Sequence, residues 1–230
     1  MAHRRHVLRA VGALGIGGIT ATSGCLGVLT GSEPARFAAG TATVPQSTLD
    51  TTNFEEFEID TVEVEREFSA AGQTRTVVVT NTLAQYDRAV EIPGVGRYRA
   101  SLFTTFTTPA VEILGQTFNP VKDLSTRELA RRALSRFERI EDLQQTGSET
   151  IQLLGTETTV GLFEANATIA EGVSAEIVLH VAEAVRAGSD FVVAVGAYPK
   201  VLDQSDAIRT LFRSVRHSDE TPSGTASGGE

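Results

Sequence analysis

Few side chains in this sequence combine the residue types and spacing that catalysis requires. His3 and His6 lie near the N-terminus, and no G-x-S-x-G, H-E-x-x-H or cysteine cluster occurs in the 230 residues. The nucleophile elbow of an α/β hydrolase and the usual zinc sites are therefore not expected. His180 shares one face of a predicted strand with Val178 and Ala182, which favours a structural histidine over the base of a Ser-His-Asp triad. The sequence predicts no catalytic residue, no bound metal and no cofactor.

Three carboxylates at alternate positions come nearest to a cation site. Glu63, Glu65 and Glu67 project from one face of a predicted strand, about 6.6 Å apart per step. Oxygen ligands suit Ca²⁺ or Mg²⁺, but such sites usually take one ligand from each of several segments. We therefore interpret these glutamates as a solvated acidic face.

The single cysteine, Cys25, follows a segment with the layout of an export signal. Arg4 and Arg5 precede an uncharged, glycine-containing stretch, residues 10–32, in which small residues lead up to the cysteine. A thiolate is a strong nucleophile and can accept a thioether-linked lipid, so we predict cleavage before Cys25 and a lipid anchor on its thiol. An uncleaved membrane helix and a secreted, unanchored product are the alternatives. All three place the domain outside the cytoplasm.

Charge and composition divide the chain and exclude one class of partner. The formal net charge is −9, and residues 1–24 contain three arginines and no acidic residue. The rest of the chain is thus more acidic still, so no nucleic-acid partner is expected. We assign residues 1–24 to the export signal, residues 25–36 to a lipid-anchored tether, residues 37–217 to a single domain and residues 218–230 to a disordered tail. The tether reaches at most about 40 Å, which keeps the domain close to the membrane.

Strand patterns dominate the domain. Residues 54–68 alternate apolar and charged side chains, and a change of phase after Thr61 predicts a β-bulge there. The turn Pro-Gly-Val-Gly, residues 93–96, separates two long strand patterns and predicts an antiparallel hairpin. The other predicted strands are residues 37–44, 74–90, 97–108, 149–155, 158–169, 174–188 and 189–199.

Two helices are predicted among these strands. Ser125 and Glu128 form an S-x-x-E capping box, and apolar residues then recur at helical spacing as far as Ile140. A closing helix over residues 204–216 has the same periodicity. The fold class is therefore α+β, with an antiparallel β-sheet of about seven or eight strands and two main helices packed on one face.

Basic side chains on the first predicted helix suggest an interaction surface. Arg127 and Arg131 are the candidate contacts, either for lipid headgroups or for an acidic partner. Acidic residues in the same helix bring its charge close to zero, and Glu128 with Arg132 is an ordinary i, i+4 pair. A solvated helix face is the alternative. Arg132, Arg136 and Arg139 are the other arginines of this helix.

Residues 114–123 form a candidate binding loop between a strand and this helix. We single out Gln116 and Phe118, because loops on a rigid scaffold often carry function. The alternative is a connector in which Phe118 fills the core. If the domain were an enzyme of unrecognised type, its site is expected here together with His180.

One strand pattern contains an acceptor sequence for N-glycosylation. Asn166, Ala167 and Thr168 fit the Asn-x-Ser/Thr motif, and this modification is available to an exported protein. Because the motif lies within a predicted strand, an unmodified Asn166 is the alternative.

Four segments resemble a known family: RRHVLRAVG…SGCLG, TRTVVVTNTLAQY, EILGQTFNPVKDLSTRELA and DFVVAVGAYP. With the acidic, lysine-poor composition, they resemble a haloarchaeal family of twin-arginine-exported lipoproteins of unknown function. The outline of strands and terminal helix is similar to the PsbP-like α/β sandwich. The resemblance implies a lipid-anchored protein on the extracytoplasmic face of the cell membrane.

The sequence thus favours a non-catalytic, membrane-tethered binding or interaction domain. Its expected partners are the membrane, through the lipid on Cys25, and an envelope protein or a small-molecule ligand. The alternatives are an enzyme with a site near residues 114–123 and a structural component of the envelope.

Overall fold

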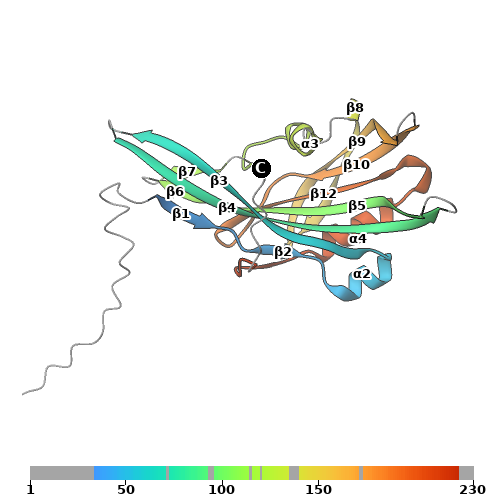
Figure 1. Cartoon of the computed structure of the whole chain (residues 1–230), viewed down its shortest axis with the longest axis horizontal. Coiled ribbons are helices and arrows are strands. Elements are labelled where there is room, and N and C mark those ends of the chain that lie inside the picture. The colour runs from blue at the N-terminus through green and yellow to red at the C-terminus, as the bar shows by residue number, and fades with distance from the viewer. Residues whose placement is uncertain are drawn as a thin grey trace, which may run out of the picture.

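The computed structural model describes residues 34–70, 73–92, 96–113, 116–119, 121–134, 140–170 and 173–222. Within these residues the chain folds around a nine-stranded sheet accompanied by helices (Figure 1). The prediction of a sheet-dominated fold with helices is therefore confirmed. Arg4, Arg5 and Cys25, the predicted export and attachment residues, lie outside the described residues.

Nine strands form the main sheet within the described part of the chain. They are β1 (Ala35–Ala38), β3 (Glu55–Ala70), β4 (Gln73–Ile92), β5 (Gly96–Pro109), β8 (Ile140–Leu153), β9 (Thr156–Ala170), β10 (Val173–Ala182), β11 (Val185–Ala187) and β12 (Asp190–Pro199). The order is β1-β4-β5-β12-β10-β9-β8, with β3 paired to β4 and β11 to β12. β1 runs parallel to β4 and the other pairs are antiparallel, so the sheet is mixed.

Two short antiparallel strand pairs lie outside the main sheet. β2 (Thr41–Thr43) packs over β4 and β5 and pairs with β13 (Arg216–Ser218), close to the end of the domain. β6 (Val111–Ile113) pairs with β7 (Gln116–Phe118) in the segment that leads from β5 to the first long helix. β2 falls within the predicted strand of residues 37–44 and β7 within the predicted loop, whereas β13 begins at the predicted end of the closing helix.

The predicted hairpins are present, but the predicted bulge is displaced. β3 with β4 and β4 with β5 form antiparallel pairs. The register shift in β3 lies between Glu56 and Glu58, whereas Thr61 faces Thr82 in uninterrupted pairing. Residues 55–67 of β3 have no fully buried side chain, although Ile59 packs partly against the core, so the core fixes little of their apolar alternation. A change of phase in such an outer strand does not require a bulge.

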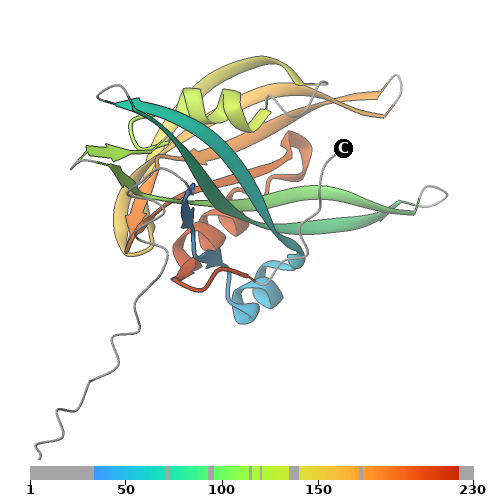
Figure 2. The same ribbon diagram turned by 60° about the vertical axis from the view of Figure 1, so that its left-hand side comes forward.

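The sheet is buried on both faces, and the two main helices lie on opposite faces. Val192 of β12 belongs to the core beneath α4 (Ser205–Ser214), whereas Phe191 and Val193 belong to the core beneath α3 (Thr126–Leu134). Figures 1 and 2 show α3 and α4 on the two sides of the strands. The predicted packing of both helices on one face is therefore wrong. The physical reason lies in β12, whose consecutive apolar residues are typical of a strand buried on both faces.

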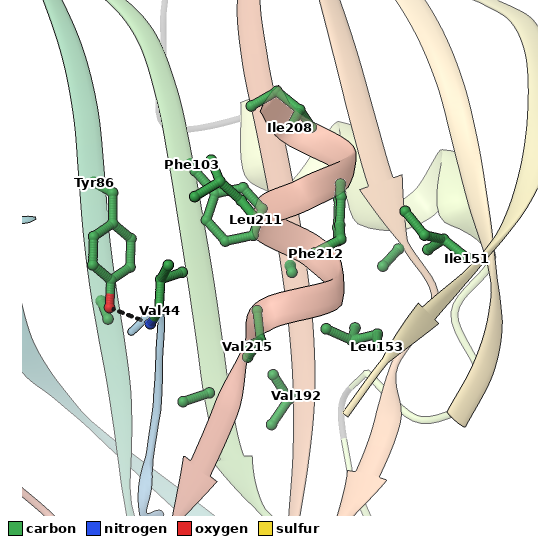
Figure 3. Close-up of a cluster of buried hydrophobic side chains, with 14 of the residues drawn as sticks. Val44, Tyr86, Phe103, Ile151, Leu153, Val192, Ile208, Leu211, Phe212 and Val215 are labelled. Carbon is green, nitrogen blue, oxygen red and sulfur yellow. Dashed lines mark hydrogen bonds between the residues drawn. The ribbon is translucent and has the colours of Figure 1, made fainter. Parts of the chain in front are cut away.

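Helix α4 packs against the sheet through the apolar positions that the sequence predicts. Ile208, Leu211 and Phe212 are fully buried, and the rings of Phe212 and Phe103 meet edge to face with centroids 5.2 Å apart (Figure 3). Gly196 of β12 permits the close approach, because a Cβ at this position would lie 2.5 Å from Cγ2 of Ile208. The closing helix is thus confirmed, with slightly shorter bounds than predicted.

Helix α3 begins at the predicted capping box but ends earlier than predicted. The Ser125 hydroxyl donates to a Glu128 carboxylate oxygen at 2.7 Å, and the Ser125 N–H donates to the same oxygen at 2.9 Å. Ile140, predicted as the last apolar position of the helix, is instead the first residue of β8. It packs at the edge of the α3-side core from this strand, so its helical spacing is coincidental. Phe137 lies outside the described residues.

A short helix, α2 (Gln46–Thr52), does not follow from the sequence pattern. Leu49 is its one large apolar side chain and is buried, so there is no periodicity to detect. Asn53 ends the helix in the left-handed conformation, with φ of 55°. Before the helix, the Val44 N–H donates to the Tyr86 hydroxyl at 3.0 Å (Figure 3), and burial raises the pKa of Tyr86 to about 12.

Candidate functional site

One ionisable cluster joins α4 to three strands of the sheet. It consists of Glu149 on β8, His180 on β10, Tyr198 on β12 and Arg209 on α4, and we call it the His180 network. Nε2 of His180 lies 3.2 Å from the Tyr198 hydroxyl, and Nδ1 lies 3.4 Å from Oε1 of Glu149. Nε of Arg209 donates to Oε2 of Glu149 at 2.8 Å. Four elements that are distant in the sequence are therefore linked by one chain of polar contacts.

Burial determines the charge of His180 within this network. The side chain is 2% exposed, and burial lowers the pKa of the imidazole. The charge of Glu149 raises that pKa, but burial is the larger effect, and the guanidinium of Arg209 acts in the same direction as burial. Nδ1 and Glu149 Oε1 are close enough for an ion pair but are not aligned for a hydrogen bond. The imidazole is therefore neutral at pH 7.

Access to the His180 network is limited to its outer pair. Glu149 and Arg209 have side chains 23% and 30% exposed, whereas His180 and Tyr198 are buried. A solute can reach the carboxylate and the guanidinium but not the imidazole. The expectation that His180 packs within the sheet is confirmed. The network joins α4 to β8 through Arg209 and Glu149, and Glu149 in turn contacts His180 on β10.

A second ionisable pair ties the two ends of the domain together. Asp190, at the start of β12, is 1% exposed, and its Oδ2 accepts the Gly40 N–H at 2.8 Å and lies 2.8 Å from Nε2 of His217. We call these three residues the terminal clasp. A side chain at position 40 has no room, because a Cβ would lie 2.0 Å from the Ser218 carbonyl oxygen. The Thr221 hydroxyl also donates to a carbonyl of the N-terminal segment at 2.7 Å.

The terminal clasp is a feature that the sequence pattern does not reveal. His217 follows α4 and Asp190 precedes a buried strand, and their separation along the chain gives no reason to pair them. Ser218, which we assigned to the tail, is the last residue of β13.

An exposed apolar corner follows β12. The 3₁₀ helix η1 (Lys200–Leu202) leaves the Val201 side chain 88% exposed. The Lys200 ammonium lies 2.8 Å from Glu164 and 3.8 Å from Glu176. We call this surface the 200–202 corner. A shallow, open groove beside it is lined by Ala175, Glu176, Lys200 and Val201.

The predicted arginines lie on α3 but do not join either ionisable cluster. Nη2 of Arg127 lies 3.5 Å from Oε1 of Gln145, at the limit of a hydrogen bond. Arg131 is exposed, while Leu129 faces the core. Helix α3 therefore presents basic side chains to solvent, as the sequence indicates. Arg136 and Arg139 lie outside the described residues.

The predicted binding loop, residues 114–123, contains β7, which pairs with β6 just before the loop. Gln116 and Phe118 belong to β7, and their side chains lie outside the described part of the structure. Asn119 stabilises the following turn, because its Oδ1 accepts the Val121 N–H at 2.9 Å and its Nδ2 donates to the Pro109 carbonyl at 3.1 Å. These hydrogen bonds hold the turn that follows β7.

The loop and His180 lie on opposite faces of the sheet. Val121 packs with Leu179 and Val181 in the α3-side core. Side chains alternate along β10, so His180 points to the other face, where Arg209 of α4 completes its network. The described residues therefore do not bring the loop and His180 together, as an enzyme site built from both would require.

The acidic face of β3 and the acceptor sequence are both exposed. Glu63, Glu65 and Glu67 are exposed, and the Thr80 hydroxyl donates to Glu63 at 3.3 Å. Among the residues that the structure describes, no group of three His, Cys, Asp or Glu side chains is placed to hold a metal ion. Asn166 lies in β9 with its side chain exposed.

Comparison with known families gives a match over most of the domain. Residues 41–216 match the family described as a domain of unknown function, DUF6517. Since the match covers more than half of the chain, the chain belongs to this family. No curated protein matches the chain. In the described ranges, none of the helices has the length and apolar composition needed to cross a membrane.

Proposed function

We propose that this member of the DUF6517 family is a lipoprotein, anchored through Cys25 on the extracytoplasmic face of the cell membrane, whose domain is a non-catalytic binding module. The observation that carries the proposal is the 200–202 corner, an exposed apolar surface at the end of the sheet away from the N-terminal strand β1. The export pattern around Arg4, Arg5 and Cys25 supports the location.

The separation of β1 and the corner follows from the strand register. β1 pairs with residues 77–80 of β4, whereas the Arg88 side chain at the other end of β4 contacts Gln204, just after the corner. About ten residues of strand separate the two positions, which corresponds to roughly 30 Å. Figure 1 shows β1 and α4 toward opposite ends of the domain. A tether that enters through β1 would therefore direct the corner away from the membrane.

The chemistry of the corner suits a protein partner. An isolated exposed apolar residue is common on protein surfaces, but Val201 lies next to a groove and to the ion pairs of Lys200 with Glu164 and Glu176. A partner that docks there would cover an aliphatic side chain and meet charges of both signs. Such a mixture gives orientation as well as contact area.

The ionisable side chains of the interior support a non-catalytic role. The His180 network joins α4 to the sheet, and the terminal clasp joins β2, β12 and β13. His180 in the network and Asp190 in the clasp are both buried against other protein groups. A binding module uses such pairs to hold its shape.

Crosslinking in intact cells tests the proposal. We would compare the wild type with Cys25→Ser, Val201→Asp and, as a matched control, Thr156→Asp at the exposed start of β9. The expected result is a specific envelope protein recovered with the wild type and Thr156→Asp, but not with Val201→Asp. Cys25→Ser is expected to leave the membrane fraction.

Three outcomes would contradict the proposal. Recovery of the same partner with Val201→Asp would show that the corner is not the binding surface. Unchanged membrane attachment of Cys25→Ser would show that the anchor is not a lipid on that thiol. A hydrolytic or redox activity of the purified protein that one substitution abolishes would show that the domain is an enzyme.

A further inference from the structure

We propose that Asn166 carries an N-linked glycan in the exported protein. Residues 166–168 are the only Asn-x-Ser/Thr sequence in the chain. The proposal rests on the proposed export, because the transferring enzymes act outside the cytoplasm. Four observations on this part of the sheet support it: the exposure of the Asn166 amide, its long hydrogen bond, the position of the motif in β9, and the long hydrogen bond of the Thr168 hydroxyl.

The Asn166 side chain is exposed and only weakly held. Its Nδ2 lies 3.4 Å from an Asp142 carboxylate oxygen, which is long for a hydrogen bond between these groups. Its neighbours across the sheet are Glu141 on β8 and Glu176 on β10. These side chains are polar, so attaching a sugar would displace water rather than disrupt an apolar contact.

The acceptor sequence lies where β9 leaves the body of the sheet. The described part of β8 begins with Ile140, which faces Ala167, while β9 continues to Ala170 with β10 beside it. Within the described residues, Thr168 therefore has a neighbouring strand on one side only. Its pairing with β10 is followed by a register shift between Val173 and Ser174.

In the described ranges only β10 pairs with the last residues of β9, so the backbone there can open without unfolding the domain. The end of a two-stranded ribbon opens at a small cost, because few hydrogen bonds and few buried contacts are lost. β8 is also irregular nearby, since its pairing with β9 shifts between Glu141 and Gln144 and Asp142 has φ of 58°. An enzyme can therefore bend the acceptor segment while the core beneath α4 stays intact.

The hydroxyl at the third position is available for recognition. Thr168 Oγ1 lies 3.5 Å from the Ser174 hydroxyl, the limit of a hydrogen bond. The enzyme that recognises the motif needs a hydroxyl two residues after the asparagine. A threonine whose hydroxyl makes a short hydrogen bond within the protein would be poorly recognised by the enzyme. The contact of the Thr168 hydroxyl is longer than that.

The chemical step is a glycosyl transfer. Nδ2 of Asn166 attacks the anomeric carbon of a lipid-phosphate-linked oligosaccharide, which supplies the sugar. The bond from Nδ2 to this carbon forms as the bond from the carbon to the phosphate oxygen breaks. The lipid phosphate leaves with the bonding electron pair, and one amide proton passes to a base of the transferring enzyme. No group is oxidised or reduced.

Mass spectrometry of the full chain from membranes of its native host tests the proposal. We would compare the wild type with Asn166→Gln, Thr168→Ala and Thr168→Ser, the last of which keeps the motif. The wild type and Thr168→Ser are expected to carry a mass increment equal to one oligosaccharide, located on the peptide that contains Asn166. Asn166→Gln and Thr168→Ala are expected to lack it.

The outcomes separate the glycan from the proposed location. A wild-type protein in the membrane fraction whose Asn166 peptide is wholly unmodified would overturn the glycan and leave the anchor standing. An unmodified protein found only in the cytoplasm would overturn both. Because the Asn166 peptide is measured in the wild type, the result does not depend on the folding of any variant.

Discussion

The substitution Gly196→Ala tests how closely α4 packs on the sheet. A Cβ at this position would lie 2.5 Å from Cγ2 and 2.9 Å from Cδ1 of Ile208, well inside van der Waals contact. Ile208 is fully buried and its β-branched side chain has few rotamers. Overpacking of this kind costs about 1–3 kcal/mol, and the lower entropy of unfolded Ala recovers about 0.4–1 kcal/mol. We expect the free energy of unfolding to fall by about 1–2 kcal/mol.

Two comparisons make this prediction specific to the contact. In Gly147→Ala the new Cβ would lie 3.7 Å from Cδ1 of Leu162, an ordinary contact, so little change in stability is expected. Ile208→Ala alone should cost about 2–5 kcal/mol through the cavity that it leaves. Combined with Gly196→Ala, it removes the clash, so the double variant should be more stable than the sum of the single effects by about 1–2 kcal/mol.

Denaturant unfolding followed by far-ultraviolet circular dichroism provides the measurement, because the chain has no tryptophan. The four variants should share the slope of the wild type, so that midpoints report stability. Equal stability of Gly196→Ala and Gly147→Ala would refute the close approach of α4 to β12. Additive effects of Gly196→Ala and Ile208→Ala would refute the assignment of the clash to that side chain.

Three further predictions concern the clusters and the corner. Burial lowers the pKa of His180 from its ordinary 6.5. As the pH falls below 6.5, the unfolded chain binds a proton at this residue more readily than the folded chain, so the free energy of unfolding decreases. His180→Gln should flatten this decrease between about pH 7 and pH 5. Asp190→Ala leaves Gly40 and His217 without their shared partner, and should cost about 3 kcal/mol and speed amide exchange in β2 and β13. Val201→Asp should change the free energy of unfolding by less than about 0.5 kcal/mol, which separates loss of a partner from loss of fold.

Local patterns in the sequence predicted the elements better than their arrangement. The capping box at Ser125 and the spacing of Ile208, Leu211 and Phe212 depend on neighbouring residues, and both features are present in the structure. The end of α3 was mispredicted because Ile140 continues a helical spacing although it belongs to a strand. Apolar spacing alone cannot distinguish the last turn of a helix from the first residue of the next element.

The placement of the helices and the polar clusters could not be derived in this way. The consecutive apolar residues around Val192 indicate burial on both faces, which argues for helices on both sides, but the pattern does not say which helix lies on which face. The contact of Asp190 with Gly40 joins residues 150 positions apart. Such pairs depend on the path of the whole chain, and without related sequences there is no signal that relates them.

The terminal clasp couples the position of the tether to the interior of the sheet. A force applied through residues before Pro34 would act first on β1, which is held by its parallel pairing with residues 77–80 of β4. The chain then passes through Gly40, whose N–H is bonded to a carboxylate that is 1% exposed, and through β2, which is paired with β13. Load on the N-terminal segment is therefore shared by an edge strand, a buried carboxylate and the C-terminal strand. A segment held by the edge strand alone would instead peel from the sheet one hydrogen bond at a time.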